Sequence, residues 1–75
     1  MRSVLTAVSE RLANRLKERR TELGLTQAEL AEKVGVTRKT VNTVENGVFT
    51  PSATLAIKLA QALGVTVERL FWIEP

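Results

Sequence analysis

Apolar side chains recur every three or four residues along most of the 75-residue chain, a spacing that places them on one face of a helix. The most regular stretch runs from 25 to 47. Its first half carries a broad apolar stripe, formed by Leu25, Ala28, Leu30, Ala31 and Val34. Its second half carries only Val41 and Val44, which leaves most of that surface outside the core. The pattern predicts two short helices that are buried to different degrees.

Capping signals mark the ends of these two helices. Thr26 and Glu29 form a capping box, in which the hydroxyl and the carboxylate each bond a free backbone N–H. Gly35 suits the end of the first helix, because glycine adopts the left-handed conformation without a Cβ penalty. Thr37 then offers an N-cap to the second helix. Two helices joined by a tight turn, the second with exposed polar donors, fit a DNA-binding helix-turn-helix.

The segment before this motif predicts a helix that starts at about Ser9. Leu12, Leu16 and Leu23 define its inward face. Residues 1–8 fit two alternatives, either the start of the same helix or a short arm that pairs with another segment.

The segment after the motif predicts two more helices. Pro51 disfavours helix at the residue before it, and Ser52 is a suitable N-cap. The helix that follows is apolar around much of its circumference and ends at Gly64, and a last short helix runs through Leu70. The whole pattern predicts one all-α domain of five helices.

Composition narrows the range of functions. The chain has neither cysteine nor histidine, which excludes disulfides, thiolate zinc sites and the Ser–His and Cys–His nucleophilic pairs. No paired carboxylates or phosphate-cradling glycine loop stands out, so we expect no enzyme, no cofactor and no metal site. The net charge is +3, and no apolar run approaches the roughly 20 residues of a membrane span. We therefore expect a cytoplasmic protein with no membrane partner.

A set of short motifs follows in order along the chain: Thr26-Gln27, Leu30-Ala31, Gly35-Val36-Thr37, Val44-Glu45-Asn46-Gly47, Pro51, Leu59-Ala60 and Ala62-Leu63-Gly64-Val65. Together they resemble the Cro/C1-type (XRE-like) helix-turn-helix family, which includes phage repressors and small stand-alone bacterial regulators. The resemblance covers roughly residues 12–72. It implies a compact five-helix lambda-repressor-like domain whose second and third helices form the helix-turn-helix, and a protein that binds double-stranded DNA.

The resemblance assigns DNA contacts position by position. It implies base contacts from one set of side chains, namely Arg38, Lys39, Asn42 and Thr43. It implies phosphate contacts from a second set, namely Gln27, Thr26, Thr37, Thr40 and Asn46. Phosphate contact alone is the alternative for Arg38 and Lys39. A purely conformational role in the turn with Gly47 is the alternative for Asn46, and an exposed polar position is the alternative for Gln27.

The family also commonly has an ion pair between the first helix and the end of the third, at the positions of Arg20 and Glu45 in this chain. A guanidinium bonds a carboxylate through two parallel N–H groups, which fixes orientation as well as distance. The resemblance therefore implies a structural Arg20–Glu45 pair.

The two ends of the chain are less constrained by the resemblance. We expect residues 1–11 to form an N-terminal extension and residues 12–75 to form the domain. Small regulators of this kind often associate through their C-terminal parts, which implies a homodimer with residues 70–75 at its interface. The interface residues expected are Phe71, Trp72, Ile73 and Leu5. The alternative places Phe71 and Trp72 in the monomer core.

These observations predict a sequence-specific transcriptional regulator, in this family usually a repressor, that binds an inverted-repeat operator as a homodimer through the major groove. One alternative is an antitoxin-type protein that binds a toxin partner and regulates its own promoter. Another is a helical bundle that has lost DNA binding. A single domain offers no separate pocket, so no small-molecule ligand is predicted.

Overall fold

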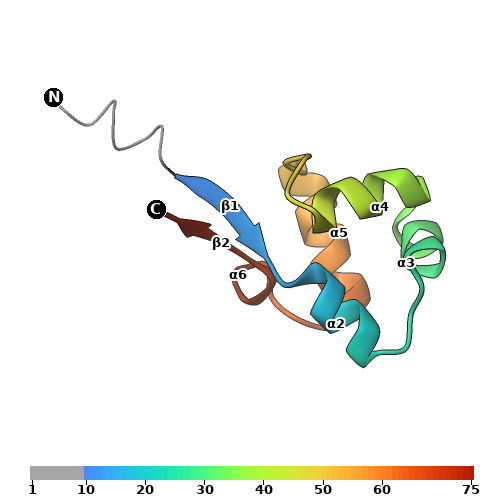
Figure 1. Ribbon diagram of the computed structural model, residues 1–75. Coiled ribbons are helices and arrows are strands. Elements are labelled where there is room, and N and C mark those ends of the chain that lie inside the picture. The colour runs from blue at the N-terminus through green and yellow to red at the C-terminus, as the bar shows by residue number, and fades with distance from the viewer. Residues whose placement is uncertain (1–9) are drawn as a thin grey trace, which may run out of the picture.

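Five helices and a two-stranded antiparallel sheet make up residues 10–75, the part of the chain that the computed structural model describes (Figure 1). None of these helices is long and apolar enough to cross a membrane. The five helices and their class are as predicted, and the sheet is an addition. In chain order the elements are β1 (Arg11–Asn14), α2 (Leu16–Glu22), α3 (Gln27–Val34), α4 (Arg38–Glu45), α5 (Ala53–Leu63), α6 (Val67–Leu70) and β2 (Phe71–Glu74).

The caps predicted for α3 and α4 are confirmed. The Glu29 N–H donates to Thr26 Oγ1 at 3.0 Å, and the Thr26 N–H donates to Glu29 Oε1 at 2.8 Å. Thr37 Oγ1 accepts from the Thr40 N–H at 3.1 Å. Gly35 ends α3 with a φ of 77°, in the left-handed region that glycine favours. The capping box therefore fixes the start of α3, and Gly35 and Thr37 fix the turn between the two helices.

The apolar faces of the helices meet in one core. α3 packs against both α4 and α5, and α5 supplies Leu59, Ala60 and Leu63. α4 contributes only Val41 and Val44, each 1% exposed, so the predicted narrow stripe is confirmed. Burial of this stripe holds α4 by one face and leaves the opposite face in solvent.

The helix predicted from about Ser9 is wrong over residues 11–14, which form β1, and α2 begins only at Leu16. Backbone pairing with β2 satisfies the N–H and C=O groups of this segment that face the partner strand, in place of helical bonds. The partner strand lies at the opposite end of the chain, so a local pattern could not indicate it. The predictions for residues 1–9, including Leu5, lie outside the described residues.

β1 and β2 form a thin extension, here called the terminal ribbon, on the side of the molecule away from α3 (Figure 1). Its base joins the core through Phe71, which is 6% exposed. Toward its tip Ile73 is 60% exposed and lies opposite the half-buried Leu12 in the strand register. The ribbon therefore presents an exposed apolar side chain outside the helical body.

Candidate nucleic-acid interface

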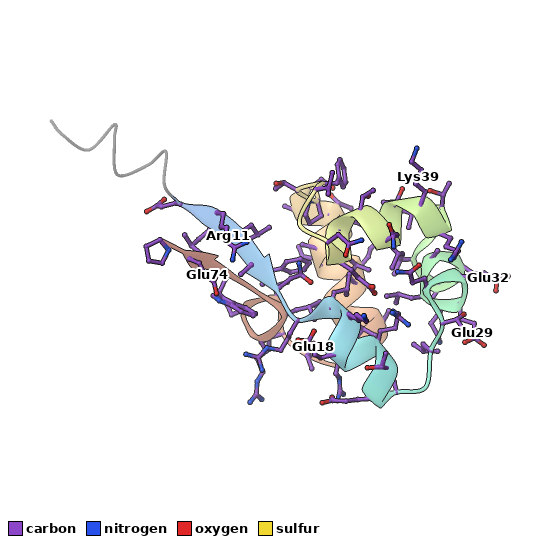
Figure 2. The ribbon with its side chains drawn as sticks, viewed as in Figure 1. Arg11, Glu18, Glu29, Glu32, Lys39 and Glu74 are labelled. Atoms are coloured by element: carbon purple, nitrogen blue, oxygen red, sulfur yellow. The ribbon has the colours of Figure 1, made fainter. Side chains whose placement is uncertain are left out.

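The outer face of α4 carries the side chains that are free to bind another molecule. Arg38, Lys39 and Asn42 are exposed, and no hydrogen bond or ion pair within residues 10–75 engages their side chains. Lys39 points away from the helical body (Figure 2). Because Val41 and Val44 anchor the inner face, the direction of this outer face is set by the core.

The threonines near α4 are engaged differently. The Thr37 and Thr40 hydroxyl oxygens lie 2.9 Å apart, and Thr37 also caps the helix. The half-buried Thr43 donates its hydroxyl hydrogen to the Thr40 carbonyl at 3.0 Å. Thr26 is likewise held in its capping box. Four side chains are expected to contact bases. Thr43 is the one of these four whose side-chain donor is already engaged within its own helix.

The ion pair between Arg20 and Glu45 is present and joins α2 to the end of α4. Arg20 Nε lies 2.6 Å from Glu45 Oε2, and Arg20 Nη2 donates to Oε1 at 3.3 Å. The guanidinium also donates through Nη1 to the Leu25 carbonyl at 2.8 Å. The two side chains are 9% and 3% exposed. A buried pair of this kind constrains the geometry strongly, because neither charge has water to replace its partner.

Gln27 extends this network to α3. Its Nε2 donates to Glu45 Oε1 at 3.0 Å, so Glu45 receives both the arginine and the amide. Gln27 is the first residue of α3 and is half-buried. Among the described residues 10–75 nothing bonds its second Nε2 hydrogen or its Oε1. The network brings the first residue of α3 and the last residue of α4 together.

The backbone of the turn after α4 bears on the two roles considered for Asn46, a phosphate contact and a conformational role in the turn. The left-handed conformation belongs to Gly47, with a φ of 73°, while Asn46 has a φ of −87°. The Asn46 side chain is exposed beside the end of α4. The turn therefore does not require Asn46 itself to adopt a positive φ.

The three C-terminal residues expected at a dimer interface differ in how far they are buried. Phe71 packs in the monomer core, as the alternative interpretation had it, which leaves little of its side chain for a partner. Trp72 is half-buried, with the Arg15 guanidinium 5.0 Å from its ring centre, a cation–π distance. Ile73 alone of the three is largely exposed.

Two structural residues have roles that the sequence did not indicate. The Asn14 side chain bonds both the start of α2 and the end of α4. Arg19 donates through Nε to the Leu63 carbonyl at 2.9 Å, which satisfies a free carbonyl at the end of α5. The available signal for Asn14 was an asparagine two residues before Leu16, and the expectation of a longer first helix concealed it.

Comparison with known proteins also identifies a helix-turn-helix protein. A helix-turn-helix family model matches residues 16–70. A relative from Bacillus subtilis (strain 168), named the HTH-type transcriptional regulator YgzD, is 43% identical over 63 residues, which are 84% of this chain and 96% of the relative. The antitoxin HigA-1 of Vibrio cholerae is 52% identical over 52 residues, 68% of this chain but 46% of the antitoxin. The structure of the biofilm regulator SinR in complex with DNA superposes with a TM-score of 0.66 at 35% identity, covering 71% of this chain and 86% of that one.

Proposed function

Because the chain belongs to the Cro/C1-type helix-turn-helix family of DNA-binding transcriptional regulators, we propose that it acts in the cytoplasm as a homodimeric repressor on an inverted-repeat operator. The observation that carries this proposal is the outer face of α4, where three donor side chains are exposed above a buried apolar stripe and have no partner among residues 10–75. Repression follows when the operator overlaps a promoter, because the bound dimer and the polymerase compete for the same DNA.

In this proposal α4 enters the major groove as the recognition helix. Arg38 and Lys39 donate to guanine O6 and N7, and Asn42 bonds adenine N6 and N7. The γ-methyl group of Thr43 packs against a thymine methyl, since its hydroxyl hydrogen is engaged with the Thr40 carbonyl.

Phosphate contacts bracket the recognition helix. The free Nε2 hydrogen of Gln27 and the N–H groups at the start of α3 meet one phosphate, where a helix N-terminus favours an anion. Asn46, exposed beyond the other end of α4, meets another. The hydroxyls of Thr26, Thr37 and Thr40 add acceptors or donors on the same side. Such contacts set the register of the helix on DNA without reading sequence.

The homodimer uses the terminal ribbon. Ile73 is the exposed apolar residue there, and Leu12 lies across the ribbon from it. A two-fold dimer places two recognition helices in successive major grooves, with half-sites about 34–36 Å apart or a multiple of that. Trp72, which is half-buried, contributes its remaining exposed surface to this interface.

Selection of bound sites from a random pool of DNA, at a stated salt concentration, tests this function. We expect one enriched inverted repeat for the wild type and none for the double variant Arg38→Ala, Asn42→Ala. Lys17→Ala is the matched control, since it removes a charge from an exposed position of α2 and should keep the same repeat. Enrichment of no sequence by the wild type would contradict the proposal, because phosphate contacts alone do not select bases.

Similarity to the antitoxin HigA-1 favours one alternative, a regulator that also binds a toxin. In that case the exposed part of the ribbon binds the toxin. A short reading frame for a toxin-like protein next to this gene would favour the alternative, and purification of the two products as a complex would establish it.

A further inference from the structure

Asn14 stands at the junction of β1 and α2 and bonds in two directions. Its Oδ1 accepts from the Leu16 N–H at 2.9 Å, which satisfies one of the free N–H groups at the start of α2. Its Nδ2 donates to the Val44 carbonyl at 3.0 Å. That carbonyl lies in the last turn of α4, where it has no partner within the helix, and it also accepts from the Gly47 N–H at 3.1 Å. One amide side chain thus links the ribbon to the end of the recognition helix.

This link is the single hydrogen bond between the ribbon and α4 within residues 10–75. The neighbouring Glu45 is held by Arg20, so the ion pair fixes α4 to the helical body, whereas Asn14 fixes it to the ribbon. Each strand of the ribbon has four residues, and a two-stranded sheet of this size is marginal by itself. The direction of the ribbon therefore depends on the contacts at its base.

In a dimer joined through the two ribbons, the distance between the recognition helices depends on the angle between each ribbon and its own α4. We infer that Asn14 sets this angle and so determines which half-site spacing the protein accepts. Asn14 is then a positioning residue, which acts on specificity without touching a base. The effect of Asn14 on half-site spacing rests on the proposed function, whereas the coupling between the ribbon and α4 is a property of a single chain.

Asn14→Asp separates this role from the bond to the Leu16 N–H. The aspartate keeps an oxygen acceptor for that N–H. It has no donor for the Val44 carbonyl, so the link to α4 is lost. If Asn14 serves only to accept from the Leu16 N–H, the variant will behave like the wild type in both experiments below.

The first experiment measures the coupling within one chain. The protein has no cysteine, so spin labels can be attached at Glu10→Cys and Lys39→Cys alone, both exposed, one beside the ribbon and one on α4. Labelled protein is diluted into unlabelled protein so that each dimer carries one labelled chain. We expect Asn14→Asp to widen the distance distribution about twofold, because a locally weakened segment samples more orientations.

Gln61→Glu is the matched control for this experiment. It makes the same amide-to-carboxylate change at an exposed position of α5 and should leave the distribution as in the wild type. An Asn14→Asp distribution equal to that of the wild type would overturn the inference.

The second experiment measures the consequence for DNA. Operators selected by the wild type are altered by inserting or deleting one base pair between the half-sites. We expect the wild type to discriminate by about tenfold between spacings and Asn14→Asp by about threefold or less. Retention of the full discrimination by the variant would contradict the spacing role. If the wild type is monomeric and its binding does not depend on spacing, the homodimer and the spacing role are both refuted. The distances between the spin labels would then still decide whether Asn14 couples the ribbon to α4.

Discussion

The helix-turn-helix and the terminal ribbon use different kinds of contact to hold a surface in place. In α3 and α4, caps within three residues and a buried apolar stripe fix two adjacent helices, and the Arg20–Glu45 pair closes the far end. In the ribbon, two strands from opposite ends of the described chain pair with each other, and the ion pair Arg11–Glu74 that crosses them is in solvent (Figure 2).

This difference matches what each surface presents. Exposed donors on α4 must lie at fixed positions to meet base edges, which requires a well-anchored helix. The ribbon presents Ile73, and an apolar contact tolerates more variation in position than a hydrogen bond does. Substitutions that remove the anchoring contacts of the first region should therefore change stability, and those in the ribbon should mainly change association.

The largest loss of stability is expected when the buried ion pair is broken. Arg20→Ala or Glu45→Ala should lower the free energy of unfolding by about 3–5 kcal/mol, because the remaining charge stays buried without its partner. Urea denaturation of both single variants and the double variant measures this. Additive losses, with no coupling between the two positions, would contradict the role of the pair. Arg11→Ala is the control, since its exposed pair should contribute at most about 1 kcal/mol.

The next largest loss of stability is expected from a cavity in the core under α3. Leu30→Ala should cost about 2–5 kcal/mol, because Leu30 is completely buried and the space it leaves cannot close fully. Thermal and urea unfolding report the loss. A cost below that of an exposed substitution such as Ile57→Ala would show that the core is not organised as described.

Loss of the cap on α4 should have a smaller effect. Thr37→Ala removes the acceptor for the Thr40 N–H and should cost about 1 kcal/mol, whereas Thr37→Ser keeps the oxygen and should stay near the wild type. Equal melting temperatures for the three proteins would argue against a capping role.

The smallest effect on folding, and the clearest effect on assembly, is expected in the ribbon. Ile73→Ser should change stability by no more than about 0.5 kcal/mol but shift the mass in sedimentation from dimer toward monomer. Ile57→Ser is the matched control, because Ile57 is an isoleucine of similar exposure, 48% against 60% for Ile73, and lies on α5. One monomeric mass for all three proteins would rule out the dimer.

The same two regions show what the sequence could predict. The caps at Thr26 and Thr37 and the stripe of Val41 and Val44 were predictable because they depend on residues three or four positions apart. The Arg20–Glu45 pair was implied by family resemblance and by no local pattern. β1 was missed because its pairing partner is at the other end of the chain, and Leu12 fits the spacing of a helix equally well. The link from Asn14 to Val44 was missed for the same reason, since it exists only once β1 is in place.

If the outer face of α4 reads bases, Asn42→Ala should change the base preference at one position of each half-site. Binding of the wild type and the variant would be measured on operators that carry every single-base change. We expect the variant to lose about 1–3 kcal/mol of discrimination at one symmetric position in each half-site and to keep the preferences at all other positions. A uniform loss of affinity across every sequence would assign Asn42 to phosphate binding, and an unchanged profile would remove α4 from base recognition at this position.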